Sequence, residues 1–312
     1  MKYGGFVNQI IKDEVSKPDK IVLFGQNVST GSCISGFTRG MEVKEGGLIL
    51  NTPNAENSLC GIGFGLMISG VPSIFFMKQQ DFLLLGIDQL VNTYNFIRRK
   101  KPASSFTIMN VVVDSGYEGP QSCFNSFGDI CSIARIPGYT VTNKIDVEEV
   151  LRTQMVSPGF RIIGVSQRLF KEDLIELDKV AAAEDKSWFQ YSEGKDATVV
   201  CFNFSLPYGQ ELCSRMKDKG LLASLFSVNA VTPVKWSSII EDLKKTGKLV
   251  LMNDSKSANL SSDSFLAEAL EKCALQKKIV LKRKLDGYWL APNADMLEIN
   301  YEDVINELGY KV

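Results

Sequence analysis

Short apolar runs alternate with longer amphipathic stretches along the chain, and this alternation limits the fold more than any other feature of the sequence. The apolar runs of the first half are rich in Val, Ile and Phe, and they cover residues 21–25, 73–77, 106–113 and 161–165. Nearly continuous apolar strands are typical of parallel sheets that helices cover on both faces. The stretches from Glu56, Asp81 and Asp146 each begin with an acidic residue, which suits a helix N-terminus. We therefore predict a doubly wound α/β domain.

A second set of alternations follows a charged stretch. Residues 176–195 lose the strand pattern and indicate a linker between domains. Four further apolar runs, separated by helical patterns, cover residues 197–202, 223–228, 248–253 and 278–284. We expect two doubly wound α/β domains, residues 1–175 and a smaller one at residues 196–312. A chain of 312 residues can bury two such cores.

Charge and cysteine usage exclude several functions. The 35 Lys and Arg residues nearly balance the 36 Asp and Glu residues, so no strong field would attract nucleic acid or an anionic membrane. The first residues carry charges where a signal peptide needs an apolar run, and no run is long enough to span a membrane, so we expect a cytoplasmic protein. The seven cysteines form no CxxC pair, which indicates reduced thiols and no zinc site.

Histidine is absent from the chain. The usual general base, the Ser-His and Cys-His catalytic pairs and the commonest transition-metal ligand are therefore missing. Any chemistry must use carboxylates, amines or a cofactor that supplies its own acid and base.

A predicted helix combines an acidic start with three closely spaced glycines. Glu56 begins this helix, and Gly61, Gly63 and Gly65 leave a bare surface on it. Each glycine inside a helix costs roughly 0.5–1 kcal/mol relative to alanine, so three of them need a packing or functional reason. The GxGxG string lies within the helix and not in a strand-to-helix turn, so it is weak support for a dinucleotide-binding fold.

The segment that contains this helix, residues 52–92, closely resembles the beta subunit of the thiamine-dependent first component of 2-oxoacid dehydrogenases, in the transketolase-like family. Other segments resemble the same family in the same order, namely residues 21–41, 134–141, 164–171, 229–236 and 245–254. The resemblance implies a thiamine-diphosphate pyrimidine-binding domain followed by a transketolase C-terminal-like domain. It also implies an activity that cleaves or forms a carbon–carbon bond beside the carbonyl of a 2-keto substrate.

The resemblance also implies roles for individual residues. Glu56 matches the carboxylate that bonds to the pyrimidine ring of thiamine diphosphate and activates the cofactor, which carries the chemistry itself. Phe82 matches the ring that stacks against the pyrimidine, and Lys78 matches a neighbour that touches it. Without the resemblance, Glu56 is interpreted as stabilising a helix N-terminus and Phe82 as a core residue. Asp88 and Gln89 match a DQ pair of the family, although their plain interpretation is helix polarity and subunit packing.

Two departures from the family concern the expected substrate pocket. Residues 119–126 replace a segment that supplies an active-site histidine, and Ser122, beside Gln121, stands in its place. Serine cannot shuttle a proton near neutral pH, and if Ser122 only fills the space, its replacement by alanine should cost little. Gln26 and Asn27 stand where the family's early loop usually carries acidic residues, which implies a polar but uncharged substrate wall.

The sequence lacks the motif that holds magnesium and diphosphate in this superfamily. Gly128 and Asp129 form a GD pair, but Ile130 follows and no matching Asn pair lies downstream. The resemblance therefore implies an alpha-type partner subunit that holds the diphosphate and Mg, in an alpha2-beta2 assembly. The alternatives are a non-oxidative split transketolase or carboligase subunit, in sugar or secondary-metabolite synthesis, and a non-catalytic assembly or regulatory paralogue.

Overall fold

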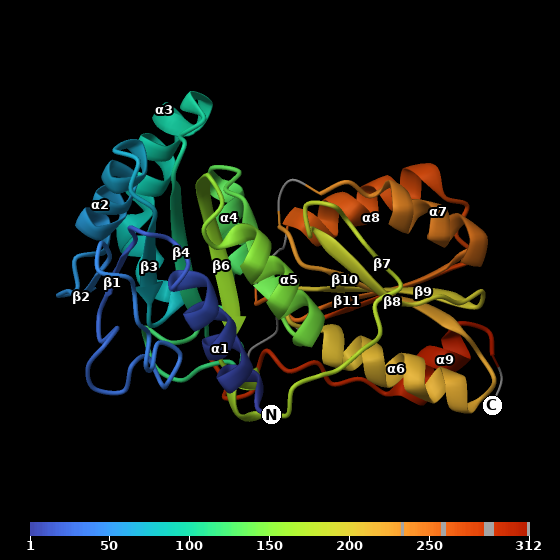
Figure 1. The fold of residues 1–312 in the computed structure, drawn as a ribbon. Helices are drawn as coiled ribbons and strands as arrows, with labels where there is room; N and C mark the ends of the chain where they lie inside the picture. The colour runs from blue at the N-terminus through green and yellow to red at the C-terminus, as the bar shows by residue number, and fades with distance from the viewer. Residues whose placement is uncertain (232–233, 257–259, 284–289, 311–312) are drawn as a thin grey trace.

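Two six-stranded sheets, one in each half of the chain, organise the fold (Figure 1). The computed structural model describes residues 1–231, 234–256, 260–283 and 290–310. Residues 232–233 and 284, which belong to segments used in the sequence analysis, lie outside this description. The predicted α/β class with two doubly wound sheets is confirmed. All seven cysteines are free, and no helix of the described residues is long and apolar enough to cross a membrane.

The first sheet contains only parallel strands, in the spatial order β2-β1-β3-β4-β6-β5. These strands are β1 (Val22–Gly25), β2 (Leu48–Asn51), β3 (Ser73–Met77), β4 (Ser105–Val112), β5 (Gly138–Val141) and β6 (Gly159–Ser166). The four apolar runs correctly predicted β1, β3, β4 and β6. No apolar run marks β2, which lies largely exposed at one edge, or β5, in which Gly138 and Thr140 interrupt the apolar residues.

Helices cover both faces of this sheet. On one face, α1 (Tyr3–Val15) and α5 (Lys144–Gln154) pack against each other. The other face carries α2 (Glu56–Ile68), the 3-10 helix η1 (Gln80–Gly86), the π-helix η2 (Gln89–Thr93), α3 (Tyr94–Ile97), the 3-10 helix η3 (Arg98–Lys100) and α4 (Phe127–Ile133). The helix expected from Asp81 is thus a 3-10 helix that continues into other helix types.

Close packing explains one of the three glycines of α2. A Cβ on Gly63 would lie 2.2 Å from the ring of Phe106, which belongs to β4. A Cβ on Gly61 would make ordinary contact with Gln89 at 3.6 Å, and one on Gly65 would meet nothing within 4 Å. The absence of a side chain at Gly63 therefore lets α2 pack closely against the sheet, whereas Gly65 has open space around it.

The second sheet has the order β12-β11-β9-β10-β8-β7. Its strands are β7 (Ala181–Ala182), β8 (Trp188–Ser192), β9 (Ala197–Phe202), β10 (Ala223–Val228), β11 (Lys248–Asn253) and β12 (Lys277–Lys282). The last four are parallel, and β8 and β7 add an antiparallel edge. One face is covered by α6 (Leu206–Asp218) and α9 (Tyr301–Glu307), and the other by α7 (Ser237–Thr246) and α8 (Leu260–Lys272).

The expectation of a strand-free linker at residues 176–195 is wrong in part. β7 and β8 lie within this range, and Trp188 of β8 pairs with Val228 of β10. Trp188, Phe189 and Tyr191 are buried. Charged residues on both sides of these aromatics hide the strand pattern in the sequence, so the second sheet begins earlier than residue 196.

The two halves are joined by backbone pairing as well as by packing. β5 forms one edge of the first sheet, and residues 229–231 from the second half lie along it. Thr140 N donates to Asn229 O at 2.7 Å, and Val231 N donates to Gly138 O at 2.9 Å. One hydrophobic cluster contains residues of α1 and α5 from the first half and of α6 and α9 from the second. The two sheets are therefore held in one fixed arrangement.

Candidate functional site

The residues selected from the sequence all follow the carboxyl ends of neighbouring strands in the first sheet. Gln26 and Asn27 follow β1, Glu56 begins the helix after β2, Lys78 and Phe82 follow β3, and Gln121 and Ser122 lie after β4. These four strands are adjacent and parallel, so their carboxyl ends lie at one edge. Open α/β sheets bind ligands outside this edge. The fold therefore brings all the candidate residues to the edge where a ligand site is expected.

The loop after β1 begins with a close backbone approach. Gly25 has φ 147°, and a Cβ there would lie 2.1 Å from Phe76 O of β3, so no larger residue fits without a shift of the backbone. Asn27 follows with φ 55°, a left-handed conformation that asparagine tolerates. The loop is joined to β2 because Asn51 Oδ1 accepts from Ser29 N at 3.0 Å. Gln26 and Asn27 are half-buried at this edge.

Glu56 is the first residue of α2 and is only 7% exposed. Its carboxylate has no hydrogen bond or ion pair with any residue that the structure describes. η1 packs against this turn, since a Cβ on Gly86 would lie 3.4 Å from Glu56 O. Burial, followed by the nearby charge of Glu56, raises the pKa of the Cys60 thiol to about 12. The Glu56 oxygens are not among the described buried side-chain atoms that lack a hydrogen-bond partner, so water reaches them and an external donor can reach them as well.

The remaining residues after β3 divide into two groups. Phe82 is half-buried and packs on the cluster beneath α2, whereas Lys78 is exposed. Asp88 and Gln89 accept hydrogen bonds from side chains four residues later, at 2.6 and 2.5 Å. These hydrogen bonds of the DQ pair are local helix contacts, which agrees with its plain interpretation.

Ser122 bonds to a residue that sequence reasoning did not select. Gln79, between Lys78 and Phe82, donates from Nε2 to Ser122 Oγ at 2.7 Å. Both side chains are half-buried. Gln121, one residue earlier, is exposed. The only indication of Gln79 in the sequence is its place between two residues that match the family's cofactor contacts.

Two buried charged residues, Asp81 and Lys256, contact the backbone directly after Ser122. Asp81 Oδ2 accepts from Cys123 N at 3.1 Å and from Phe124 N at 3.5 Å, while its Oδ1 has no hydrogen-bond partner. Burial raises the pKa of Asp81 to about 6. Lys256, from the second half, is 1% exposed and donates to Cys123 O at 2.6 Å. Asp81 and Lys256 help to line a cavity of about 270 Å³.

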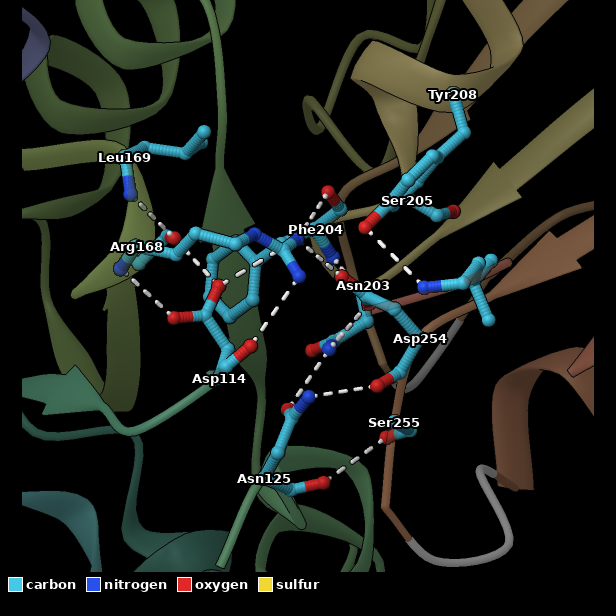
Figure 2. Close-up of polar contacts among 12 residues, drawn as sticks. Asp114, Asn125, Arg168, Leu169, Asn203, Phe204, Ser205, Tyr208, Asp254 and Ser255 are labelled. Carbon is cyan, nitrogen blue, oxygen red and sulfur yellow. Dashed lines mark hydrogen bonds and ion pairs between the residues drawn. The ribbon is translucent and has the colours of Figure 1, made fainter. Parts of the chain in front are cut away.

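An ionic network joins the two sheets behind the site (Figure 2). Arg168, after β6, lies 2.6 Å from Asp254 Oδ2, after β11, and 3.7 Å from Asp114 Oδ2, after β4. Both carboxylates are fully buried. Burial, opposed by Arg168, raises the pKa of Asp114 to about 6. The carboxyl ends of strands from both sheets therefore converge on one guanidinium.

Two asparagines extend this network toward the candidate site. Asn203 donates from Nδ2 to Asp254 Oδ1 at 2.8 Å and to Asn125 Oδ1 at 2.9 Å. Asn125 in turn donates to Asp254 O at 2.7 Å, and its carbonyl accepts from Lys256 N, also at 2.7 Å. Figure 2 shows Asn125 reaching from the first half toward Asp254 and Ser255 of the second. The segment that carries Ser122 is thus tied to the second half three residues later.

No metal site is evident in the described ranges. They contain no group of three or more His, Cys, Asp or Glu residues that could hold a metal ion. Gly128 and Asp129, the GD pair of the sequence, lie inside α4. The residues that fit part of a thiamine cofactor are Glu56, a carboxylate without a partner, and Phe82, a half-buried ring at the same edge.

The sequence is similar to several enzyme subunits, although no family model matches it. It is 23% identical over 262 residues to the mitochondrial pyruvate dehydrogenase E1 component subunit beta of Dictyostelium discoideum, covering 80% of this chain and 72% of that protein. It is 22% identical over 292 residues to the 2-oxoisovalerate dehydrogenase subunit beta of Bacillus subtilis, covering 91% and 88%. The acetoin:2,6-dichlorophenolindophenol oxidoreductase subunit beta of Cupriavidus necator is 19% identical over 273 residues, covering 82% and 80%.

A solved structure confirms the fold class. It is described as a split gene transketolase, inactive beta4 tetramer, and superposes with a TM-score of 0.62 over 99% of this chain and 97% of its own, at 14% identity. The sequence similarities span 80–91% of the chain, which confirms the family resemblance. The chain is a relative of the beta subunits of pyruvate and 2-oxoisovalerate dehydrogenases, built on a transketolase-like fold.

Proposed function

We propose that this chain is the beta-type subunit of a two-chain thiamine-diphosphate enzyme that cleaves or forms a carbon–carbon bond beside the carbonyl of a 2-keto substrate. The similarity to dehydrogenase beta subunits over 80–91% of the chain supports this function. The observation that carries it is Glu56, a nearly buried carboxylate without an internal partner at the ligand edge of the sheet.

In this proposal, Glu56 and Phe82 hold the pyrimidine end of the cofactor. Thiamine diphosphate, when bound, supplies the carbon nucleophile that a chain without histidine lacks. The Glu56 carboxylate accepts a hydrogen bond from the pyrimidine ring and thereby holds a proton at the ring nitrogen. The half-buried ring of Phe82 offers an aromatic face for stacking. Lys78, four residues before Phe82 in the sequence, is exposed.

An alpha-type partner would hold the diphosphate and Mg. The described residues offer no acidic cluster for a metal, and the GD pair lies within α4. Apolar side chains of the same layer are at least half exposed, namely Ile62, Leu84 and Leu85. An exposed apolar surface of this kind is typical of a protein interface. We infer an alpha2-beta2 assembly in which this layer faces the partner.

The test is Glu56→Gln in the complex reconstituted with the alpha-type chain. This change preserves size but removes the carboxylate, so proton–deuterium exchange at the thiazolium carbon and turnover of 2-keto acids should both fall at least about a hundredfold. Cofactor affinity should change much less, because the partner holds the diphosphate. Glu271→Gln, an exposed site on α8, is the matched control and should leave both rates unchanged.

Exchange and turnover at the wild-type rate in the Glu56→Gln complex would contradict the proposal and favour a non-catalytic paralogue. A second candidate, a non-oxidative transketolase or carboligase subunit, is favoured by Ser122 at the usual histidine position and by the split-transketolase fold. Turnover that needs an aldehyde acceptor, and that proceeds without an electron acceptor, would identify this second function.

A further inference from the structure

Ser122 sits at the end of a tight turn whose backbone is held on both sides. Its N–H donates to Gly119 O at 3.0 Å, which closes the four-residue turn, with Pro120 at the second position. Its carbonyl accepts from Glu118 N at 2.8 Å. Proline at that position pre-sets the turn conformation. The Cα of Ser122 is therefore fixed before its side chain is considered.

The residues after Ser122 are fixed as well. Asp81 accepts from the N–H groups of Cys123 and Phe124, and Lys256 donates to the carbonyl of Cys123. The two partners come from η1 and from the second half of the chain. Both are buried, so solvent motion scarcely loosens these bonds. The Ser122 hydroxyl is thus presented from a rigid segment at the carboxyl edge of β3 and β4.

The bond from Gln79 determines which way the hydroxyl can act. A serine hydroxyl has one donor and two acceptor positions. Because Gln79 Nε2 donates to Ser122 Oγ, it occupies an acceptor position and leaves the O–H to donate elsewhere. Among the described residues, no acceptor takes this hydrogen. Both side chains are only half-buried, so an outside acceptor can reach the hydroxyl.

We propose that Gln79 and Ser122 form a fixed neutral hydrogen-bond donor for an oxygen of the 2-keto substrate. Ser122 is the residue that contacts the substrate, and Gln79 is a positioning residue that acts through it. This inference rests on the proposed function and replaces the expectation that Ser122 only fills the place of a histidine. A neutral donor binds a carbonyl or hydroxyl oxygen without transferring a proton, so its contribution does not vary with pH near neutrality.

The test compares reconstituted complexes that carry Gln79→Glu or Ser122→Ala with the reconstituted wild-type complex. A carboxylate at position 79 cannot donate, so it would accept the Ser122 O–H and turn it away from the substrate. Each change should lower kcat/KM for 2-keto acids by roughly tenfold to a hundredfold at pH 8. The double variant should lose no more than either single one, because the two residues act as a unit.

The pH profile separates positioning from a merely structural role. A protonated carboxyl donates as the amide does, so Gln79→Glu should recover toward the wild-type value as the pH falls toward the ordinary Glu pKa of about 4.3. Ser122→Ala should stay a constant factor below wild type at every pH. Gln9→Glu, an exposed site on α1, makes the same chemical change far from the turn and should match wild type throughout.

Three results would overturn the inference. Near wild-type kcat/KM for Ser122→Ala removes the substrate contact. If Ser122→Ala lowers kcat/KM but Gln79→Glu keeps the wild-type kcat/KM at every pH, Gln79 has no positioning role. Absence of thiamine-dependent turnover in the wild-type complex contradicts the proposed function itself, and this inference with it, whereas the first two results leave the proposed function intact.

Discussion

Replacing Gly63 with alanine should destabilise the protein, whereas the same change at Gly65, two residues later in α2, should stabilise it. A Cβ at Gly63 would lie 2.2 Å from the ring of Phe106, far inside the roughly 3.5–4 Å of ordinary carbon contact. The ring cannot retreat easily, because the rings of Phe64 and Phe160 both lie 5.1 Å from its centroid. Overpacking of this kind costs about 1–3 kcal/mol. Set against a helix-propensity gain of about 1 kcal/mol, the net loss should be up to about 2 kcal/mol.

At Gly65 a Cβ would meet nothing within 4 Å, so only the gain from restricting the unfolded chain applies, about 0.4–1 kcal/mol. Urea unfolding of the two variants and wild type, at one protein concentration because association shifts apparent stability, measures both effects. Equal midpoints for the two variants, or a more stable Gly63→Ala, would refute the packing account of this helix.

Other predictions concern the ionic network, the cofactor and assembly. Arg168→Met should lower the free energy of unfolding by about 3–5 kcal/mol, because it leaves Asp114 and Asp254 buried without their cation; Arg215→Met, which breaks an exposed pair, should leave the urea midpoint unchanged. The pKa of Asp114 in the folded protein is raised to about 6, above its unfolded value, so the contribution of this group to stability is present in acid and is lost as the pH rises through about 6. Loss of Arg168 raises this pKa further. The Arg168→Met variant should therefore be more destabilised, relative to wild type, at pH 8 than at pH 5. The isolated chain should bind thiamine diphosphate weakly or not at all, and tight magnesium-dependent uptake in a calorimetric titration would contradict the two-chain proposal. We also expect the isolated chain to be at least dimeric, since the structurally similar split gene transketolase chain is described as a beta4 tetramer, and a clean monomer in sedimentation at micromolar concentration would count against this.

Strands with a continuous apolar pattern could be predicted from the sequence, and strands without one could not. β3, β9, β10 and β11 begin and end where their apolar runs do. β8 escaped prediction because charged residues on both sides hide its buried aromatics in the sequence. β5 escaped because Gly138 and Thr140 alternate with its two apolar residues, so it forms no continuous apolar run.

The candidate site could be located from the sequence but not completed. The resemblance selected Glu56, Phe82 and Ser122, and parallel strand order explains why they lie at one edge. Gln79 and Lys256 could not be found in this way, since their importance depends on contacts 43 and 133 residues away along the chain. Such contacts are set by how η1 and the two halves meet, and no local pattern records them.

The pairing of β5 with residues 229–231 also bears on the order in which the protein can fold during synthesis. The chain emerges from the ribosome N-terminus first, so all strands of the first sheet are present before Asn229 and Val231 appear. Until then the edge of β5 has unpaired backbone groups, a state that favours strand exchange with other chains. The protein therefore most needs protection from aggregation in the period after the first sheet is synthesised and before residues 229–231 appear. Slow translation between residues 166 and 229 would lengthen this period.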